Sequence, residues 1–426
     1  MKKILILIVI IAVAAFAYIF ITNQKEEIPI LETAEEKVTI DNYYVYGTHF
    51  DPEGSFNIED ANFDDIVLTL YNGEFQDIKI DYDQDVTNIT FNINKEEINN
   101  GFYLDDLERG TYYLFIKATY EPEEEDGEVK EVYYALDNQT DYDEITYYTL
   151  HEKNNKIEIN SNNDYPTMMF NVTEKKDSKE VYDITIDPGH GGMDSGANID
   201  DVTESDLTMQ IAEATKEVLE DEGFTVKLTR TDGEYTENEV MEEYNENGRA
   251  VIPQEVKSKY TISLHFNSND YESVRGLEVY TANNINYDLA NSFVENITAE
   301  TGIEVSTNRL FRVNPGVYTH NFTETEVENA LAGYEEKDYV PYNVTTNSNY
   351  LYMIRETGGI LTGAYVDDSN EEEVGTNPYY NSNIGVETYL LELGYLTNPT
   401  ELDLITSNID NYAKAIAKSI SENIKK

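Results

Sequence analysis

The chain has 426 residues, enough for two or three domains, and 40% of them are hydrophobic, so it can bury a core. It carries 84 acidic against 29 basic residues, a net charge of −55, which excludes the basic footprint of a nucleic-acid-binding protein. It contains no cysteine, which excludes disulfides, thiolate metal sites and cysteine nucleophiles.

The N-terminus has the pattern of a membrane segment. Two lysines precede an apolar run over residues 4–21, which is about long enough to span the hydrocarbon core of a bilayer. We therefore expect an uncleaved, single-pass transmembrane anchor over 1–24 and an acidic linker over 25–37, with the rest of the chain extracytoplasmic at the cell membrane. The alternative is a cleaved signal peptide and a secreted protein, because Ala15 and Ala17 flank a cleavage-like position.

Residues 38–175 are expected to form an all-β, sandwich-like domain. Apolar and polar residues alternate in several segments, such as 78–82 and 89–93, and turn residues interrupt them at short intervals. His49 and His151 are isolated and are interpreted as structural or exposed. The region is therefore expected to be a spacer or a binding module without catalytic residues.

Residues 181–426 change to alternating strand and helix patterns, which indicate a largely parallel sheet with helices on both faces. The segment from about 309 to 385 has little regular patterning and is interpreted as a long loop or insertion beside the functional site. The predicted fold class is α/β for 181–426, preceded by the all-β domain and the transmembrane helix. The predicted strands are 181–187, 224–228, 260–264, 277–280 and 389–393, and the predicted helices run from 204 to about 223, over 288–300 and over 409–424.

Two histidines stand at the carboxyl ends of predicted strands, where ligands gather in such sheets. His190 follows the first strand in a glycine-rich turn, and His265 ends a later strand. Between them, Glu204 opens a helix beside the capping pair Thr203 and Asp206. Because two histidines and one carboxylate are a ligand set of catalytic zinc with an open position for water, these residues are candidate zinc ligands.

Glu392 is the candidate catalytic base. It interrupts an apolar strand, where an unpaired carboxylate is costly. Burial and a nearby metal would tune its pKa for general-base work. Taken singly, each signal has a simpler explanation: a structural histidine, a helix-capping glutamate, a buried salt bridge. Their joint occurrence in this order favours catalysis.

The ordered motifs resemble the zinc-dependent N-acetylmuramoyl-L-alanine amidases with a catalytic domain of the third amidase type. The resemblance covers roughly 181–426. The matching segments are IDPGHGGMDSGA at 186–197, Glu204 at a helix start, LTRTD at 228–232, SLHFN at 263–267, GLEVY at 276–280 and LELGYLTN at 391–398.

The resemblance implies a bacterial cell-wall hydrolase. Zinc would be held by His190, Glu204 and His265, and Glu392 would be the catalytic glutamate. The implied reaction is hydrolysis of the amide bond between N-acetylmuramic acid and L-alanine in peptidoglycan, by zinc-activated water with a glutamate general base.

The resemblance also suggests supporting residues. Asp187 and Asn267 are candidates to hold the metal ligands in position without binding the metal themselves. Arg355 is a candidate substrate-binding residue, with a structural ion pair as the equal alternative. Arg249 resembles an arginine that the family carries before the second histidine strand, and His320 is interpreted as a loop residue rather than a ligand.

Three alternatives stay open. The fold could carry a silent site and only bind peptidoglycan. Ser195 could serve a serine hydrolase, although its surroundings lack the G-x-S-x-G spacing. A zinc peptidase or amidase could cut another wall bond. The expected partners are peptidoglycan and the membrane, with no nucleic acid; a regulatory protein and shielding of the site by 309–385 are left open.

Overall fold

The computed structural model describes residues 38–57, 63–80, 82–84, 88–91, 101–120, 129–138, 145–160, 167–192, 194–231, 248–283, 285–336, 344–364 and 377–424. The predicted anchor over 1–24 and the linker over 25–37 lie outside these residues. Within them, no helix combines the length and the apolar character needed to cross a membrane.

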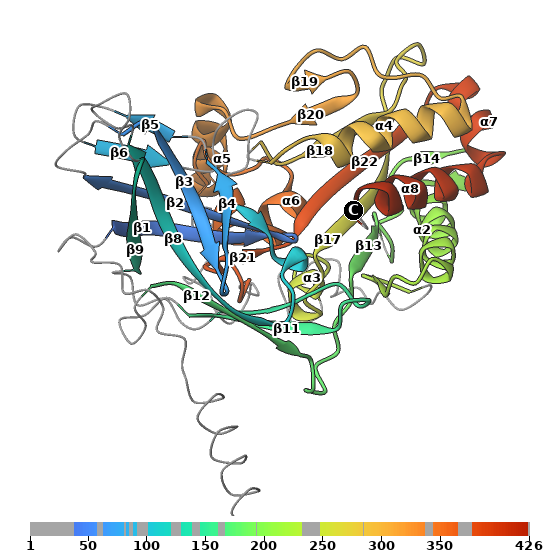
Figure 1. Ribbon diagram of the computed structural model, residues 1–426. Helices are drawn as coiled ribbons and strands as arrows, with labels where there is room; N and C mark the ends of the chain where they lie inside the picture. The colour runs from blue at the N-terminus through green and yellow to red at the C-terminus, as the bar shows by residue number, and fades with distance from the viewer. Residues whose placement is uncertain are drawn as a thin grey trace, which may run out of the picture.

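The N-terminal part of the described chain is β-rich, as predicted (Figure 1). Its strands, together with β21 (Ile384–Gly385), form one branched 13-stranded sheet in the order β10-β11-β12-β8-β9-β1-β2-β6-β5, from which β3, β4, β7 and β21 branch. The elements are β1 (Val38–Tyr46), β2 (His49–Asn57), β3 (Asp65–Tyr71), β4 (Phe75–Lys79), β5 (Tyr82–Gln84), β6 (Asn88–Phe91), β7 (Phe102–Tyr103), η1 (Leu104–Asp106), β8 (Gly110–Tyr120), β9 (Lys130–Asn138), β10 (Ile145–Tyr148), β11 (Asn155–Asn160) and β12 (Met169–Glu174).

Strand β8 organises this sheet. It pairs with β3 along one edge, and with β12 and then β9 along the other. Tyr112, Leu114, Ile116 and Ala118 lie on one face and are buried, and Phe115 and Lys117 on the opposite face are buried too, so both faces of the middle of β8 are covered. The first four of these residues belong to the hydrophobic core of the β-rich region.

The C-terminal part is a seven-stranded sheet with helices, in the strand order β16-β13-β17-β22-β18-β20-β19. Its elements are β13 (Ile184–Pro188), β16 (Val226–Leu228), β17 (Tyr260–Asn267), β18 (Glu278–Thr281), β19 (Arg312–Asn314), β20 (Val317–Thr319), β22 (Glu387–Tyr395), α2 (Glu204–Asp221), α3 (Ile252–Glu255), α4 (Asp288–Thr301), α5 (Glu324–Glu336), α6 (Tyr352–Thr357), η2 (Gly359–Thr362), α7 (Pro399–Thr406) and α8 (Ile409–Ile424), beside the small pair β14 (Asn198–Ile199) and β15 (Val202–Thr203).

This sheet is mixed, not the largely parallel sheet that was expected. Four of its pairings are parallel, whereas β22–β18 and β20–β19 are antiparallel. The reason is the segment between β17 and β18, which is a loop without a crossover helix and reverses the direction of the chain. A parallel connection needs a longer crossover, so β18 enters in the opposite direction.

The segment 309–385 is more regular than predicted. It contributes β20 to the sheet, parallel to β18, and β21 to the β-rich region, parallel to β1. Strands of two or three residues are too short to show a hydrophobic period, which is why the sequence indicated only a loop.

Helices cover both faces of the sheet, as predicted. On one face, α8 lies between α2 and α4 (Figure 1). Tyr389 of β22 packs against Phe293 of α4, with ring centroids 5.5 Å apart, whereas the Oγ1 of its neighbour Thr388 lies 2.5 Å from the Oγ1 of Thr357 in α6. Because successive strand residues point to opposite faces, α6 covers the other face.

Hydrogen bonds join the β-rich region to the α/β region. The backbone N–H of Val45 donates to the carbonyl of Asn383 at 2.8 Å, and the Asn383 amide donates to the carbonyl of Tyr43 at 2.7 Å. The hydroxyls of Thr48 and Tyr260 lie 3.1 Å apart. The β-rich region is therefore fixed to the amino ends of β17 and β22.

Candidate metal centre

His190 lies in the turn after β13, in a conformation that favours glycine. Its φ is +60°, a left-handed value that costs a residue with a Cβ. A Cβ on Gly189 would lie 2.4 Å from Cε1 of His265, and a Cβ on Gly196 would lie 2.7 Å from Oε2 of Glu204. The glycines are therefore needed for the turn to approach the other two candidate ligands.

Two buried arginines hold this turn in place. Arg230 donates from Nε to the carbonyl of Pro188 at 2.9 Å and from Nη2 to that of Gly189 at 3.2 Å. Arg249 donates from Nη2 to the carbonyl of His190 at 2.7 Å. Hydrogen bonds from charged groups are the stronger kind, so these contacts offset the strain of the turn. The sequence reasoning gave neither arginine a role at this turn.

Asp187 is fully buried beneath the turn. It accepts hydrogen bonds from Thr229 at 2.6 Å and Ser263 at 2.7 Å, and its Oδ1 lies 3.6 Å from Nη1 of Arg249. Burial alone raises the pKa of Asp187, but Arg249 and the two hydroxyls outweigh it and hold the pKa below its usual value. Asp187 thus links β13 to β17, the strand that carries His265.

Glu204 begins α2, and Thr203 caps that helix by accepting from the N–H of Asp206 at 3.3 Å, as predicted. Oε1 of Glu204 accepts from the N–H of Phe266 at 2.8 Å, and Oε2 accepts from that of Ala197 at 2.9 Å. Burial raises the pKa of Glu204, but the two histidines and these N–H donors lower it well below its usual value. Glu204 is therefore an ionised carboxylate.

His190, Glu204 and His265 converge on one point. Nε2 of His190 lies 3.0 Å from Oε1 of Glu204, and Nδ1 of His265 lies 3.3 Å from each of these two atoms. Tetrahedral zinc with bonds of about 2.0–2.1 Å separates its ligand atoms by about 3.3 Å. The three donors therefore fit three corners of a zinc tetrahedron. Among the described residues, this is the sole cluster of three or more potential metal ligands.

Asp194 is a supporting carboxylate that the sequence reasoning did not assign. Its Oδ2 lies 2.8 Å from Nδ1 of His190, the ring nitrogen turned away from Glu204. Histidine ligands of metals usually donate this second N–H to a carboxylate, which fixes the tautomer and the ring orientation. The available signal was the spacing of four residues from His190 within the glycine-rich motif.

We expect Asp194→Asn to weaken zinc affinity about 10- to 100-fold, because asparagine removes the charge that makes His190 a stronger ligand. Competition with a chromophoric zinc chelator measures this effect. Asp201→Asn, an exposed carboxylate nearby in sequence, is the matched control and should change the affinity less than about twofold. Equal effects in both variants would show that Asp194 acts only through overall charge.

The metal-free protein should lose stability as the pH rises. Burial lowers the pKa of His190, but Glu204 and Asp194 outweigh it and raise the pKa from 6.5 to about 9. A pKa that is raised by folding stabilises the fold fully below pH 6.5, and the stabilisation disappears as the pH passes 9. Thermal unfolding in a chelator should therefore show Tm falling between these values. The zinc-loaded protein should lack this fall, because bound metal replaces the proton.

Glu392 stands beside His265 on the neighbouring strand, in register with it. Residues in register on paired strands point to the same face of a sheet, so the two side chains are neighbours. Its Oε2 is buried and has no hydrogen-bond partner among the described residues. Burial, followed by the charges of Glu204 and Glu278, raises the pKa of Glu392 to about 8. The residue is a carboxyl group poised to exchange a proton.

Arg355 lies in internal contacts. It is 5% exposed and donates to the carbonyls of Asn349 at 2.9 Å and Tyr350 at 3.0 Å, while Nε pairs with Glu356 at 2.8 Å. Of the two roles considered equally for Arg355, these contacts favour the structural ion pair. An arginine in a helical segment carries no sequence signal that separates these two roles.

Three further residues considered from the sequence, Asn267, Ser195 and His320, lie in different local environments. Asn267 ends β17 next to a bulge, and no residue in the described part of the chain accepts a hydrogen bond from its buried Nδ2. Ser195 donates its hydroxyl to the carbonyl of Gly196, which gives the serine-hydrolase alternative no support. His320 stacks between Phe311 and Tyr350 and contacts Glu326 at 3.1 Å, as a structural residue of the 309–385 segment.

Known proteins resemble the C-terminal part of this chain. The family model described as N-acetylmuramoyl-L-alanine amidase (Amidase_3) matches residues 184–426. The probable cell wall amidase LytH of Staphylococcus aureus is 32% identical over 111 residues, which cover 25% of this chain and 34% of that relative's length.

Two solved structures are also similar. One is the catalytic domain of CwlV, an N-acetylmuramoyl-L-alanine amidase from Bacillus (Paenibacillus) polymyxa var. colistinus, with 20% identity, a TM-score of 0.37 and coverage of 57% of this chain and 99% of that one. The other is the amidase AmiC2 of Nostoc punctiforme, with 22% identity, a TM-score of 0.35 and coverage of 57% and 97%. Because the family model spans more than half of the sequence, this chain belongs to the N-acetylmuramoyl-L-alanine amidase family.

Proposed function

We propose that this protein hydrolyses the amide bond between N-acetylmuramic acid and L-alanine in peptidoglycan, with zinc held by His190, Glu204 and His265. The observation that carries the proposal is the triangle of donor atoms, 3.0–3.3 Å on each side, with Glu392 in register beside it. The bond that is hydrolysed is inferred from the family to which the chain belongs.

Zinc at this site would supply a Lewis acid that activates water and polarises the substrate carbonyl. Glu392 takes the proton from the attacking water with its buried Oε2 and passes it to the leaving amine. A nearby cation lowers the pKa of a carboxyl group, so a bound metal would lower the pKa of Glu392 from about 8 toward a value suited to a base.

The proposal also includes location and organisation. Residues 1–24 would anchor the protein in the cell membrane, with 25–37 as a linker, so that the amidase region over 181–426 faces peptidoglycan outside. Residues 38–175 would act as a spacer or binding module between them. The apolar run after two lysines supports this placement.

Digestion of purified peptidoglycan tests the reaction. Full-length protein in detergent is incubated with the substrate, with zinc or with a chelator, and the fragments are analysed by mass spectrometry. Zinc-dependent release of peptides with N-terminal alanine is the expected result. Fragments with other ends would identify a zinc peptidase, and zinc binding without fragments would identify a wall-binding protein.

A further inference from the structure

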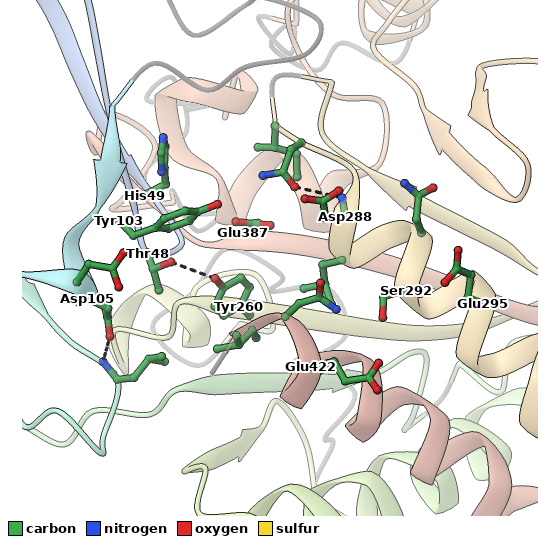
Figure 2. Close-up of a pocket in the computed structure, with 18 residues that line it drawn as sticks. Thr48, His49, Tyr103, Asp105, Tyr260, Asp288, Ser292, Glu295, Glu387 and Glu422 are labelled. Carbon is green, nitrogen blue, oxygen red and sulfur yellow. Dashed lines mark hydrogen bonds between the residues drawn. The ribbon is translucent and has the colours of Figure 1, made fainter. Parts of the chain in front are cut away.

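A cavity of about 770 Å³ lies at the junction of the β-rich region and the α/β region (Figure 2). Its walls come from β2, β7 and η1 on one side, and from β17, α4, α8 and the start of β22 on the other. Sites for small molecules usually have volumes of about 300–1,000 Å³. The cavity is therefore large enough for an organic ligand.

Carboxylates are the main charged groups that line the cavity. Neither lysine nor arginine occurs among the described residues that line it. Glu387 lies on the cavity wall at the amino end of β22, where burial raises the pKa of this group to about 7. A buried carboxylate of this kind is stabilised by a cation beside it. The six lining carboxylates are Asp105, Asp106, Asp288, Glu295, Glu387 and Glu422.

These carboxylates are too dispersed for a single metal ion. A metal site needs three or more ligand atoms around one point, and among the described residues only His190, Glu204 and His265 are grouped in this way. Charges spread over the walls of a wide cavity instead suit a cation whose own charges are spread along a chain.

His49 adds a hydrogen-bond acceptor to the same wall. It is 7% exposed, and although its Nε2 lies 3.1 Å from Oδ1 of Asp51, neither ring nitrogen makes a hydrogen bond within the described part of the chain. A buried polar atom without a partner is costly, and an ammonium N–H would satisfy it. Tyr103 and Tyr260 add aromatic rings, which attract cations over their faces (Figure 2).

We propose that this cavity binds a small organic cation with two or more protonated amines, such as an aliphatic diamine. Carboxylates and aromatic rings would hold the ammonium groups, and His49 would accept one N–H. The site is separate from the metal centre, because Tyr260 and Glu387 begin the two strands that carry His265 and Glu392 five residues later, about 16 Å along each strand.

Isothermal titration of full-length protein in detergent with 1,5-diaminopentane tests the proposal at physiological salt. We expect saturable binding of one diamine per chain, and no binding of the neutral 1,5-pentanediol. Glu387→Gln and Asp288→Asn should each weaken binding about tenfold. Glutamine at 387 can still accept the hydroxyl of Tyr389, and unfolding temperatures show whether each variant is folded.

The matched control is Glu217→Gln, which removes one negative charge from the exposed face of α2. It should change the affinity less than about twofold. Equal weakening in all three variants would overturn the proposal, since binding would then follow overall charge. Absence of saturable binding, or displacement of the diamine by calcium at equal charge, would overturn it as well.

Discussion

Replacing Glu392 by glutamine is expected to lower kcat for amide hydrolysis about 100- to 10,000-fold, the usual contribution of a general acid–base group. Glutamine has the same size but cannot take a proton from water. Its amide is neutral, and Glu392 itself is a carboxyl group whose pKa is raised to about 8, so the substitution adds no buried charge. Folding should therefore stay close to that of the native protein.

Three measurements define this result. Release of N-terminal alanine from peptidoglycan gives the rate, chelator competition gives the zinc affinity, and thermal unfolding gives the stability. Glu217→Gln serves as the control for removal of a carboxylate and should keep full activity. If Glu392→Gln keeps more than about a tenth of native kcat with zinc bound, another group is the base, and the role proposed for Glu392 is wrong.

The candidate ligands were predictable because each follows from a local rule. His190 and His265 stand at strand ends that a strand–helix alternation places at one edge of a sheet, and Thr203 fixes where the helix of Glu204 begins. Short-range patterns of this kind are encoded in neighbouring residues. The same reasoning located α8 with the bounds that the structure shows.

Features that depend on contacts between distant segments could not be predicted from the sequence. Arg249 reaches the carbonyl of His190 across 59 positions, and its donor role is invisible without the turn geometry. The antiparallel entry of β18 follows from how a loop closes. The acidic cavity brings His49 together with Glu387, which are more than three hundred residues apart. Each required the folded chain, because no period or motif joins such positions.

Glu204→Gln is expected to remove both zinc affinity and part of the stability of the metal-free fold. The charged ligand is lost, so zinc affinity should fall by more than about 100-fold, the upper limit for losing an outer partner alone. In addition, the two carboxylate oxygens accept the N–H groups of Phe266 and Ala197. A glutamine amide can accept only one of them, and its NH2 group faces the other donor. An unsatisfied buried N–H costs about 1–3 kcal/mol, which is the expected fall in the free energy of unfolding.

His265→Ala separates the two roles of Glu204. It also removes a zinc ligand, but it leaves both N–H contacts of Glu204 in place. Urea unfolding of the metal-free variants, followed by circular dichroism, should therefore show a larger loss of stability for Glu204→Gln than for His265→Ala. An equal loss would mean that the N–H contacts contribute nothing measurable. The larger loss would show that the carboxylate joins the turn before α2 to the end of β17, so that the metal site is preorganised before zinc binds.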